Sequence, residues 1–191
     1  MHKIHITDGM VLAKYHVGEA STASAILTRE SGLVRARATS ARLALSKLKY
    51  GLEPLTAGTF SFVKGKSGWR LTSITNVRRL VPAHLFARAT AGRITKLLTR
   101  LIHGEEVALA LYEAVLNGLE LLCTAQEREE VESLECVLVL RILFNLGYLP
   151  KTEFLTPFVE QGLSLELAAH AARSRSALIR TINESLQATG L

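Results

Sequence analysis

The chain has 191 residues, of which 48% are hydrophobic and 21% are charged, and its formal net charge is +6. This composition allows a buried core and excludes a disordered tail. No run of about 18 apolar residues occurs, which argues against a membrane-spanning helix, and the N-terminal residues lack the apolar stretch of a secretory signal. The two cysteines, Cys123 and Cys136, exclude a disulfide framework and indicate no zinc site, so we expect a reducing, cytoplasmic location.

The positive charge is confined to the first part of the chain. Residues 1–80 contain 13 basic and four acidic residues, a balance of +9, whereas residues 81–191 contain 10 basic and 13 acidic residues, a balance of −3. Such an asymmetry points to a polyanionic partner, most often nucleic acid. The alternative is a solvated basic surface that binds nothing specific, and charge alone leaves both possibilities open.

Residues 1–80 have the pattern of β-strands. Within residues 33–39, buried-type residues alternate with Arg35 and Arg37, which places both arginines on the outer face of one strand. Residues 64–68 have the length and composition of a hairpin loop. Together with a helix-compatible stretch at 41–50, about five short strands predict a small closed barrel, since closure removes exposed strand edges. The other expected strands are residues 9–15, 23–28, 59–63 and 69–74.

After Pro82 the pattern becomes helical. Apolar residues spaced by three and four predict helices around residues 94–101, 111–122 and 134–146. Ser164 is expected to cap one last long helix that continues to residue 186. The predicted fold class is therefore α+β, with a β-barrel domain at residues 1–80 followed by an all-α helical bundle domain at residues 81–191.

Basic residues interleaved with aromatics are the candidate nucleic-acid-binding residues of the barrel. A positive groove tracks the phosphates of a single strand, and aromatic faces stack on its bases. Phe60 and Phe62 share one strand face and are expected to be core residues rather than stacking platforms, whereas Trp69 borders a basic loop and could serve either role. The candidate residues are Tyr15, Arg35, Arg37, Arg42, Lys47, Lys49, Lys64, Lys66, Trp69 and Arg70.

Patterns typical of enzymes are weak in this sequence, and we expect no catalytic residue, metal or cofactor. The carboxylate pairs Glu105-Glu106 and Glu129-Glu130 are adjacent in sequence and have the pattern of solvent-facing charge. His2 and His5 lack a third metal ligand, and no phosphate-binding G-x-x-x-x-G-K-[ST] loop occurs. Both cysteines lie in apolar helical segments and are expected to be small core residues.

The order of residues in several segments resembles the RecO family of bacterial DNA recombination and repair mediators. The resemblance begins with residues 9–12, 18–20 and 27–36 and continues through residues 41–55. It returns at residues 140–150, a leucine-rich helix ending in Leu-Gly-Tyr. No single motif is decisive, but the order and spacing of these segments together span most of the chain.

The resemblance implies an N-terminal OB-fold barrel, a helical domain and a set of activities. Family members bind single- and double-stranded DNA, anneal complementary strands, and act with RecR and the single-strand-binding protein SSB to load RecA onto SSB-coated DNA. Many members have a cysteine-rich zinc element after the Leu-Gly-Tyr helix, whereas residues 151–157 contain no cysteine here, so the chain resembles a short form that lacks this element. Arg141 could contact the carboxylate of the SSB tail, or it could be an ordinary exposed helix arginine.

Two functions from different classes follow from the sequence. The first is a non-catalytic RecO-like mediator that binds DNA through the barrel, located in the cytoplasm and associated with the nucleoid. The alternative is a protein-interaction adaptor of the repair machinery with little DNA binding of its own. A nuclease is a distant third, because such an enzyme needs clustered carboxylates and residues 1–80 contain four scattered ones.

Overall fold

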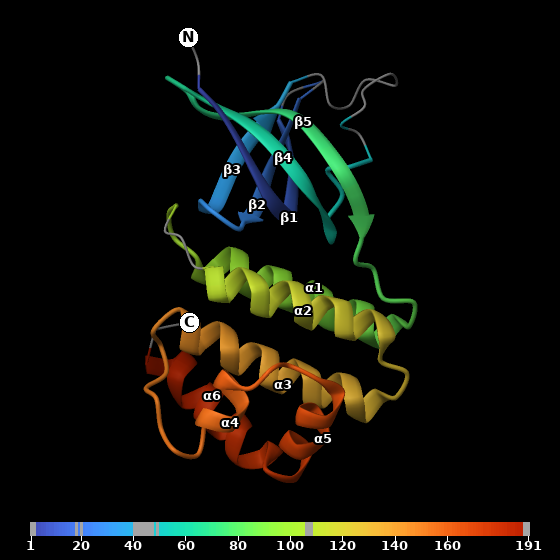
Figure 1. The fold of residues 1–191 in the computed structure, drawn as a ribbon, viewed down its shortest axis with the longest axis vertical. Helices are drawn as coiled ribbons and strands as arrows, with labels where there is room; N and C mark the ends of the chain where they lie inside the picture. Colours follow the sequence, from blue (N-terminus) through green and yellow to red (C-terminus); the bar gives the residue numbers. More distant parts are fainter. Residues whose placement is uncertain are drawn as a thin grey trace. The chain divides into compact units, whose positions relative to one another are not determined.

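The structure is a computed structural model of the chain, and it describes residues 3–17, 19, 21–39, 48, 50–105 and 109–188. In these residues five strands are followed by six helices, which confirms the α+β class; Figure 1 shows the strands and the helices in chain order. The strands are β1 (Ile4–Val17), β2 (Ser21–Thr28), β3 (Gly32–Ala38), β4 (Thr56–Gly65) and β5 (Gly68–Arg79). The helices are α1 (Leu85–Leu101), α2 (Leu109–Thr124), α3 (Arg128–Asn145), α4 (Thr156–Glu160), α5 (Leu165–Arg173) and α6 (Arg175–Ala188).

The five strands close into a barrel in the order β1-β2-β3-β5-β4. Strand β1 pairs antiparallel with both β2 and β4, and β4 pairs antiparallel with β5. The barrel closes through a short parallel pairing of β3 with β5, in which Ala36 lies opposite Trp69 and Arg37 lies opposite Arg70. This pairing determines which side chains share a face, because directly paired residues point to the same side of a sheet.

The barrel interior explains the alternating pattern of β3. Val34, Ala36 and Ala38 are at most 2% exposed, whereas Arg35 and Arg37 are exposed, as the sequence predicts. Phe60 and Phe62 are fully buried and stack with their ring centroids 6.0 Å apart, which confirms them as core residues. The buried core cluster consists of Val11, Ile26, Val34, Ala36, Ala38, Leu52, Phe60, Phe62 and Leu71.

The strands are longer than predicted, and the loop between β4 and β5 is correspondingly shorter. The sequence predicts a loop at residues 64–68, but the turn is made by Lys66 and Ser67 alone. Gly68 has a φ of 98°, a conformation that side chains rarely adopt and that a tight hairpin requires. The tight turn places Lys64 and Trp69 opposite each other at the end of the hairpin.

The helical predictions are confirmed for α1, α2 and α3. Leu111, Val115, Leu119 and Leu122 of α2 are all at most 1% exposed, and Gly147, with a φ of 78°, follows the end of α3. The part of the chain that the structure describes contains no helix of the length and apolar character needed to cross a membrane.

The prediction of one long helix after Ser164 is wrong, because the helix is interrupted at Ser174. Ser164 does cap α5, since its side chain accepts a hydrogen bond from the Leu167 amide at 3.1 Å. Ser174 ends α5 with its own amide bonded to Ala171, and its carbonyl then accepts from Ala177 and Leu178 at the start of α6. Serine competes for local backbone hydrogen bonds and so favours helix ends.

By its internal contacts the chain divides into two compact units that are interleaved in sequence. The first unit consists of residues 1–81 and 95–112, and it contains the barrel. The second consists of residues 82–94 and 113–191, and in it α3 packs against α4, α5 and α6. The boundaries between the two units fall within α1 and α2, so each of these helices contributes residues to both units.

Candidate nucleic-acid interface

Three arginines share the outer side of strands β3 and β5. Arg35 and Arg37 are two residues apart in β3, and both are exposed. Arg70 of β5 is also exposed and lies directly opposite Arg37 in the parallel pairing. We call these three residues the basic face. Two arginines paired across strands repel each other unless an anion lies between or above them, so this placement suits a polyanionic ligand.

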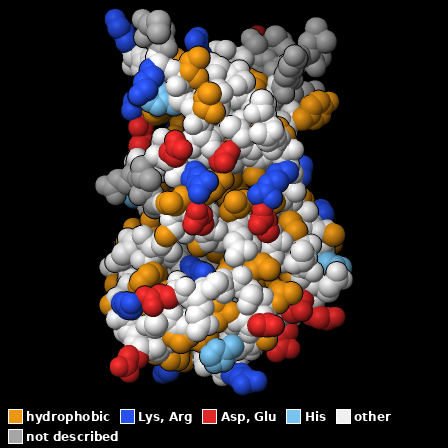
Figure 2. Space-filling model, in the orientation of Figure 1, with side chains coloured by type: hydrophobic (Ala, Val, Ile, Leu, Met, Phe, Trp, Pro, Cys, Tyr) orange, Lys and Arg blue, Asp and Glu red, His pale blue; other side chains and the backbone are white. Residues whose placement is uncertain are grey.

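The β4–β5 hairpin extends the basic face with Lys66. A hollow of about 220 Å³ is lined by Lys66 and Arg70 together with Val63, Gly65, Ser67 and Gly68. Figure 2 shows Lys and Arg side chains gathered beside a His side chain at this end of the barrel. Within the described part of the chain, none of Arg35, Arg37, Lys66 and Arg70 forms an ion pair with a carboxylate. Exposed charges of this kind can bind an external anion.

Tyr15 lies in the same cross-strand row as the basic face. It is paired with Ala23 of β2, and Ala23 is paired with Arg37 of β3. The small side chain of Ala23 separates the phenol ring of Tyr15, which is 45% exposed, from the guanidinium of Arg37. Arg37 also donates a hydrogen bond of 3.4 Å to the hydroxyl of Ser21. An exposed aromatic ring next to arginines is the combination that holds unpaired bases and their phosphates.

Trp69 is placed differently, because its ring packs inward against the barrel core. Its centroid lies 6.0 Å from that of Phe62 and 5.0 Å from that of His5, both edge to face. The ammonium of Lys64 lies 4.9 Å from the ring centroid, within the range of a cation–π contact. Since Lys64 lies over the indole, Trp69 can stack on a base only if that lysine moves.

The carboxylate of Glu105 binds both Lys64 and Trp69. Lys64 Nζ donates to Oε2 at 2.8 Å, and Trp69 Nε1 donates to Oε1 at 2.6 Å. The hydrogen bond from Lys64, followed by that from Trp69, lowers the pKa of the Glu105 carboxyl. Glu105 is exposed, as the sequence predicts, but its carboxylate also binds two side chains of the β4–β5 hairpin. No local pattern indicates this contact, because the partners are separated from Glu105 by 41 and 36 residues.

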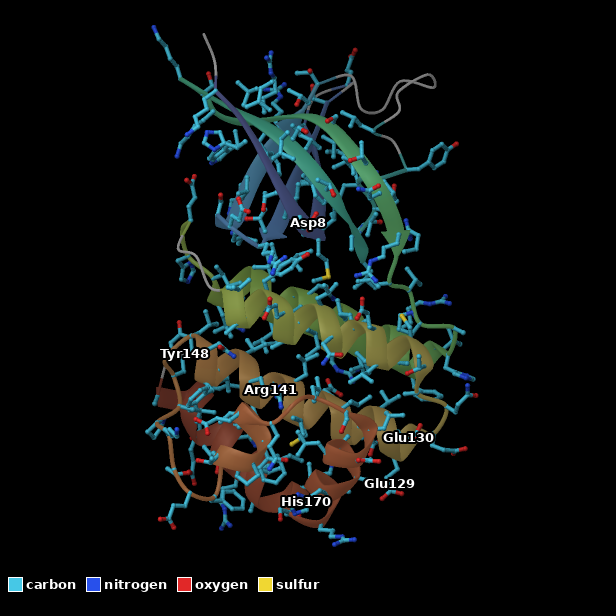
Figure 3. The ribbon with its side chains drawn as sticks, in the orientation of Figure 1. Asp8, Glu129, Glu130, Arg141, Tyr148 and His170 are labelled. Atoms are coloured by element: carbon cyan, nitrogen blue, oxygen red, sulfur yellow. The ribbon has the colours of Figure 1, made fainter. Side chains whose placement is uncertain are left out.

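Glu130 has a structural role in addition to being a charge in contact with solvent. It is the third residue of α3, and its carboxylate accepts the backbone amides of Gln126 and Glu127 at 3.0 and 3.1 Å. This is one half of a capping box, which satisfies amides that a helix start leaves without partners. Figure 3 labels Glu129 and Glu130 near the start of α3. The role of Glu130 is structural and does not suggest catalysis.

The candidates Arg42, Lys47 and Lys49 lie outside the described residues, and they remain predictions. The helix-compatible stretch at residues 41–50 also remains a prediction, because only Leu48 and Tyr50 of it are described. Among the described residues no three His, Cys, Asp or Glu side chains are grouped so that they could hold a metal ion. Cys136 is buried, which raises the pKa of its thiol to about 11, whereas Cys123 is only half-buried.

Arg141 is buried, which corrects the interpretation of an ordinary exposed helix arginine. It is only 7% exposed, and its Nε donates to the carbonyl of Phe158 at 2.8 Å. Its Nη2 donates to the carbonyl of Gln161, so the guanidinium joins α3 to the end of α4 (Figure 3). Burial lowers the pKa of this guanidinium, which nevertheless remains protonated as arginines in proteins do. In this structure Arg141 is committed to internal carbonyl groups.

We expect Arg141→Met to destabilise the helical unit by about 2 kcal/mol, because hydrogen bonds from a charged donor contribute more than neutral ones. Thermal unfolding followed by circular dichroism would measure the loss. Arg128→Met is the matched control, since Arg128 is 81% exposed by its side chain and should tolerate the change. Equal stability of the two variants would contradict a structural role for Arg141.

The fold and the basic face together define an α+β protein whose N-terminal barrel has the size and strand number of small nucleic-acid-binding modules. Residues 1–80, which include all five strands, match the family model described as Recombination protein O N terminal. Over 151 residues the chain is 28% identical to the DNA repair protein RecO of Heliobacterium modesticaldum. Both comparisons agree with the resemblance of the chain to the RecO family.

The similarity to the Heliobacterium protein covers 78% of this chain and 54% of that protein. The chain therefore spans about half the length of this relative. Because 151 aligned residues exceed the 80 residues of the barrel match, the similarity extends into the helices.

Proposed function

We propose that this protein is a non-catalytic mediator of DNA repair and recombination whose barrel binds single- and double-stranded DNA. The observation that supports the proposal is the pairing of Arg37 with Arg70 on the outer side of the barrel, next to Arg35 and Lys66 and without carboxylate partners in the described residues. The strand order, with β1 paired to β2 and β4 and with β3 paired in parallel to β5, supports the interpretation of the barrel as an OB-fold.

The physical basis of binding is the release of counterions from the phosphate backbone. Each arginine or lysine that neutralises a phosphate frees condensed cations, so affinity falls steeply as salt is added. Tyr15 adds an exposed ring on which a base can stack irrespective of its identity. Neither contribution reads base edges, so we expect binding with little sequence preference.

As a mediator, the protein would anneal complementary strands and help to load RecA onto SSB-coated DNA in association with RecR and SSB. The helical unit is the proposed site of partner contacts. Arg141 is not available to the SSB tail in this structure, because its guanidinium binds the carbonyls of Phe158 and Gln161. Contact with SSB would therefore depend on other residues or on a rearrangement of α4. A domain boundary near residue 80 and a cytoplasmic, nucleoid-associated location are parts of the same proposal.

Annealing of SSB-coated complementary oligonucleotides tests the mediator role most specifically. We expect the protein to accelerate annealing, and the variant Arg35→Gln/Arg37→Gln to lose most of this acceleration. A protein that binds naked DNA but leaves SSB-coated strands apart would be a binding module and not a mediator. A protein that binds SSB or RecR but no DNA would instead be the adaptor.

A further inference from the structure

Two hydrogen-bond donors converge on one anion at the end of the β4–β5 hairpin. Lys64 Nζ and Trp69 Nε1 come from paired residues on adjacent strands, and each donates to a different oxygen of the Glu105 carboxylate. The indole is held in place by its edge-to-face contacts with Phe62 and His5. The donors are therefore positioned by the barrel, whereas the acceptor comes from the segment after α1.

The Glu105 carboxylate is bound weakly enough by Lys64 and Trp69 for another anion to displace it. The side chains of Lys64 and Glu105 are 55% and 43% exposed, and an ion pair so open to water is weak and is screened by salt. A phosphate group likewise presents two oxygens on one central atom, and it accepts from lysine and from neutral N–H donors. Arg70 follows Trp69 in β5, and because consecutive strand residues point to opposite faces, Arg70 belongs to the outer basic face while Trp69 faces the core. An anion bound here would therefore lie at the end of the strand that carries Arg70.

We propose that Lys64 Nζ and Trp69 Nε1 form a phosphate subsite that Glu105 fills in the free protein, and that a backbone phosphate of the bound nucleic acid replaces Glu105. The proposal rests on the proposed function and adds to it a defined contact and an internal competitor. Trp69 then acts as a hydrogen-bond donor and not as a stacking platform. Glu105 lowers the affinity for nucleic acid by the cost of its own displacement.

The first test uses Glu105→Gln, which keeps the size of the side chain and removes its charge. We expect this variant to bind a single-stranded oligonucleotide about two- to fivefold more tightly at low salt, the range for displacing an exposed ion pair. Glu30→Gln is the matched control, because it removes the same charge from an exposed turn of the barrel, between β2 and β3. A second variant, Glu105→Gln/Glu106→Gln, prevents the carboxylate adjacent in sequence from taking the place of Glu105. Equal gains in the Glu105 and Glu30 variants would overturn the proposal.

The second test follows the indole N–H resonance by NMR, which is unambiguous because Trp69 is the only tryptophan of the sequence. We expect this resonance to differ between the wild type and Glu105→Gln, and to move in the wild type when the oligonucleotide is added. Inorganic phosphate should move it in the same direction only at far higher concentration. A shift of equal size at equal concentrations of inorganic phosphate would identify a free-anion site and overturn the assignment to nucleic acid.

The two proposals fail separately. If the wild type binds the oligonucleotide and loses affinity when the basic face is neutralised, but the indole resonance does not move, the phosphate subsite is wrong and the proposed function stands. If no oligonucleotide binds to any variant at low salt, the proposed function itself is wrong.

Discussion

Replacing Arg35, Arg37 and Arg70 together by glutamine is expected to weaken the binding of single-stranded DNA roughly a hundredfold at about 0.1 M salt. For single strands the association constant varies with salt to a power of about −0.7 per neutralised phosphate, so removing one arginine–phosphate pair at this salt concentration weakens binding roughly fivefold. The three side chains are exposed and share the outer side of β3 and β5. Because they have no carboxylate partners in the described residues, their removal leaves no carboxylate of those residues unpaired.

The same variant should have a flatter salt dependence, with a log–log slope smaller by about 2, since three phosphates are no longer neutralised. The matched control neutralises three exposed arginines of the helices, Arg128, Arg173 and Arg180, and so changes the net charge equally. Fluorescence anisotropy with a labelled oligonucleotide measures both quantities. An equal reduction of affinity in the two triple variants would mean that net charge, and not the basic face, determines binding.

Replacing Phe60 by alanine is expected to reduce the free energy of unfolding of the barrel by about 3–5 kcal/mol, the usual cost of removing a large buried aromatic side chain. Phe60 is fully buried, and its ring is stacked on that of Phe62 at a centroid distance of 6.0 Å. It also lies close to the backbone of β1, because a Cβ placed on Gly9 would lie 3.1 Å from the Phe60 ring. Collapse around the missing ring is limited by the closed barrel.

Fluorescence of Trp69 during a urea titration is the measurement for this variant. The single tryptophan packs against the barrel core, so its emission reports the unfolding of the barrel. Ile4→Ala is the control, because Ile4 lies on β1 with 60% of its surface exposed and should change stability by less than about 0.5 kcal/mol. An effect of Ile4→Ala as large as that of Phe60→Ala would contradict the placement of the core.

The features that can be predicted well from the sequence depend on local periodicity. Alternation in β3 correctly assigns Arg35 and Arg37 to the outer face, and spacing in α2 correctly assigns four buried residues. Charge balance points to the barrel as the basic part of the chain. These patterns can be recognised in the sequence because burial of one face makes apolar residues recur about every two residues in a strand and about every 3.6 residues in a helix.

The features that cannot be predicted in this way depend on contacts between distant segments or on single backbone hydrogen bonds. The pairing of Arg37 with Arg70 follows from barrel closure, which no local pattern specifies. Burial of Arg141 follows from the position of α4, a five-residue helix too short to predict from periodicity. The break at Ser174 depends on the bonds that its amide and carbonyl make, because the apolar spacing continues across it.

The affinity of the full chain for a labelled oligo-dT as a function of salt concentration tests the central claim most directly. We predict a straight line in the plot of the logarithm of the association constant against the logarithm of the salt concentration. Its slope is expected to be about −2.8, because Arg35, Arg37, Lys66 and Arg70 would each neutralise about one phosphate. Absence of binding at low salt, or an affinity that does not change as salt is added, would contradict the assignment of the basic face as a DNA-binding surface.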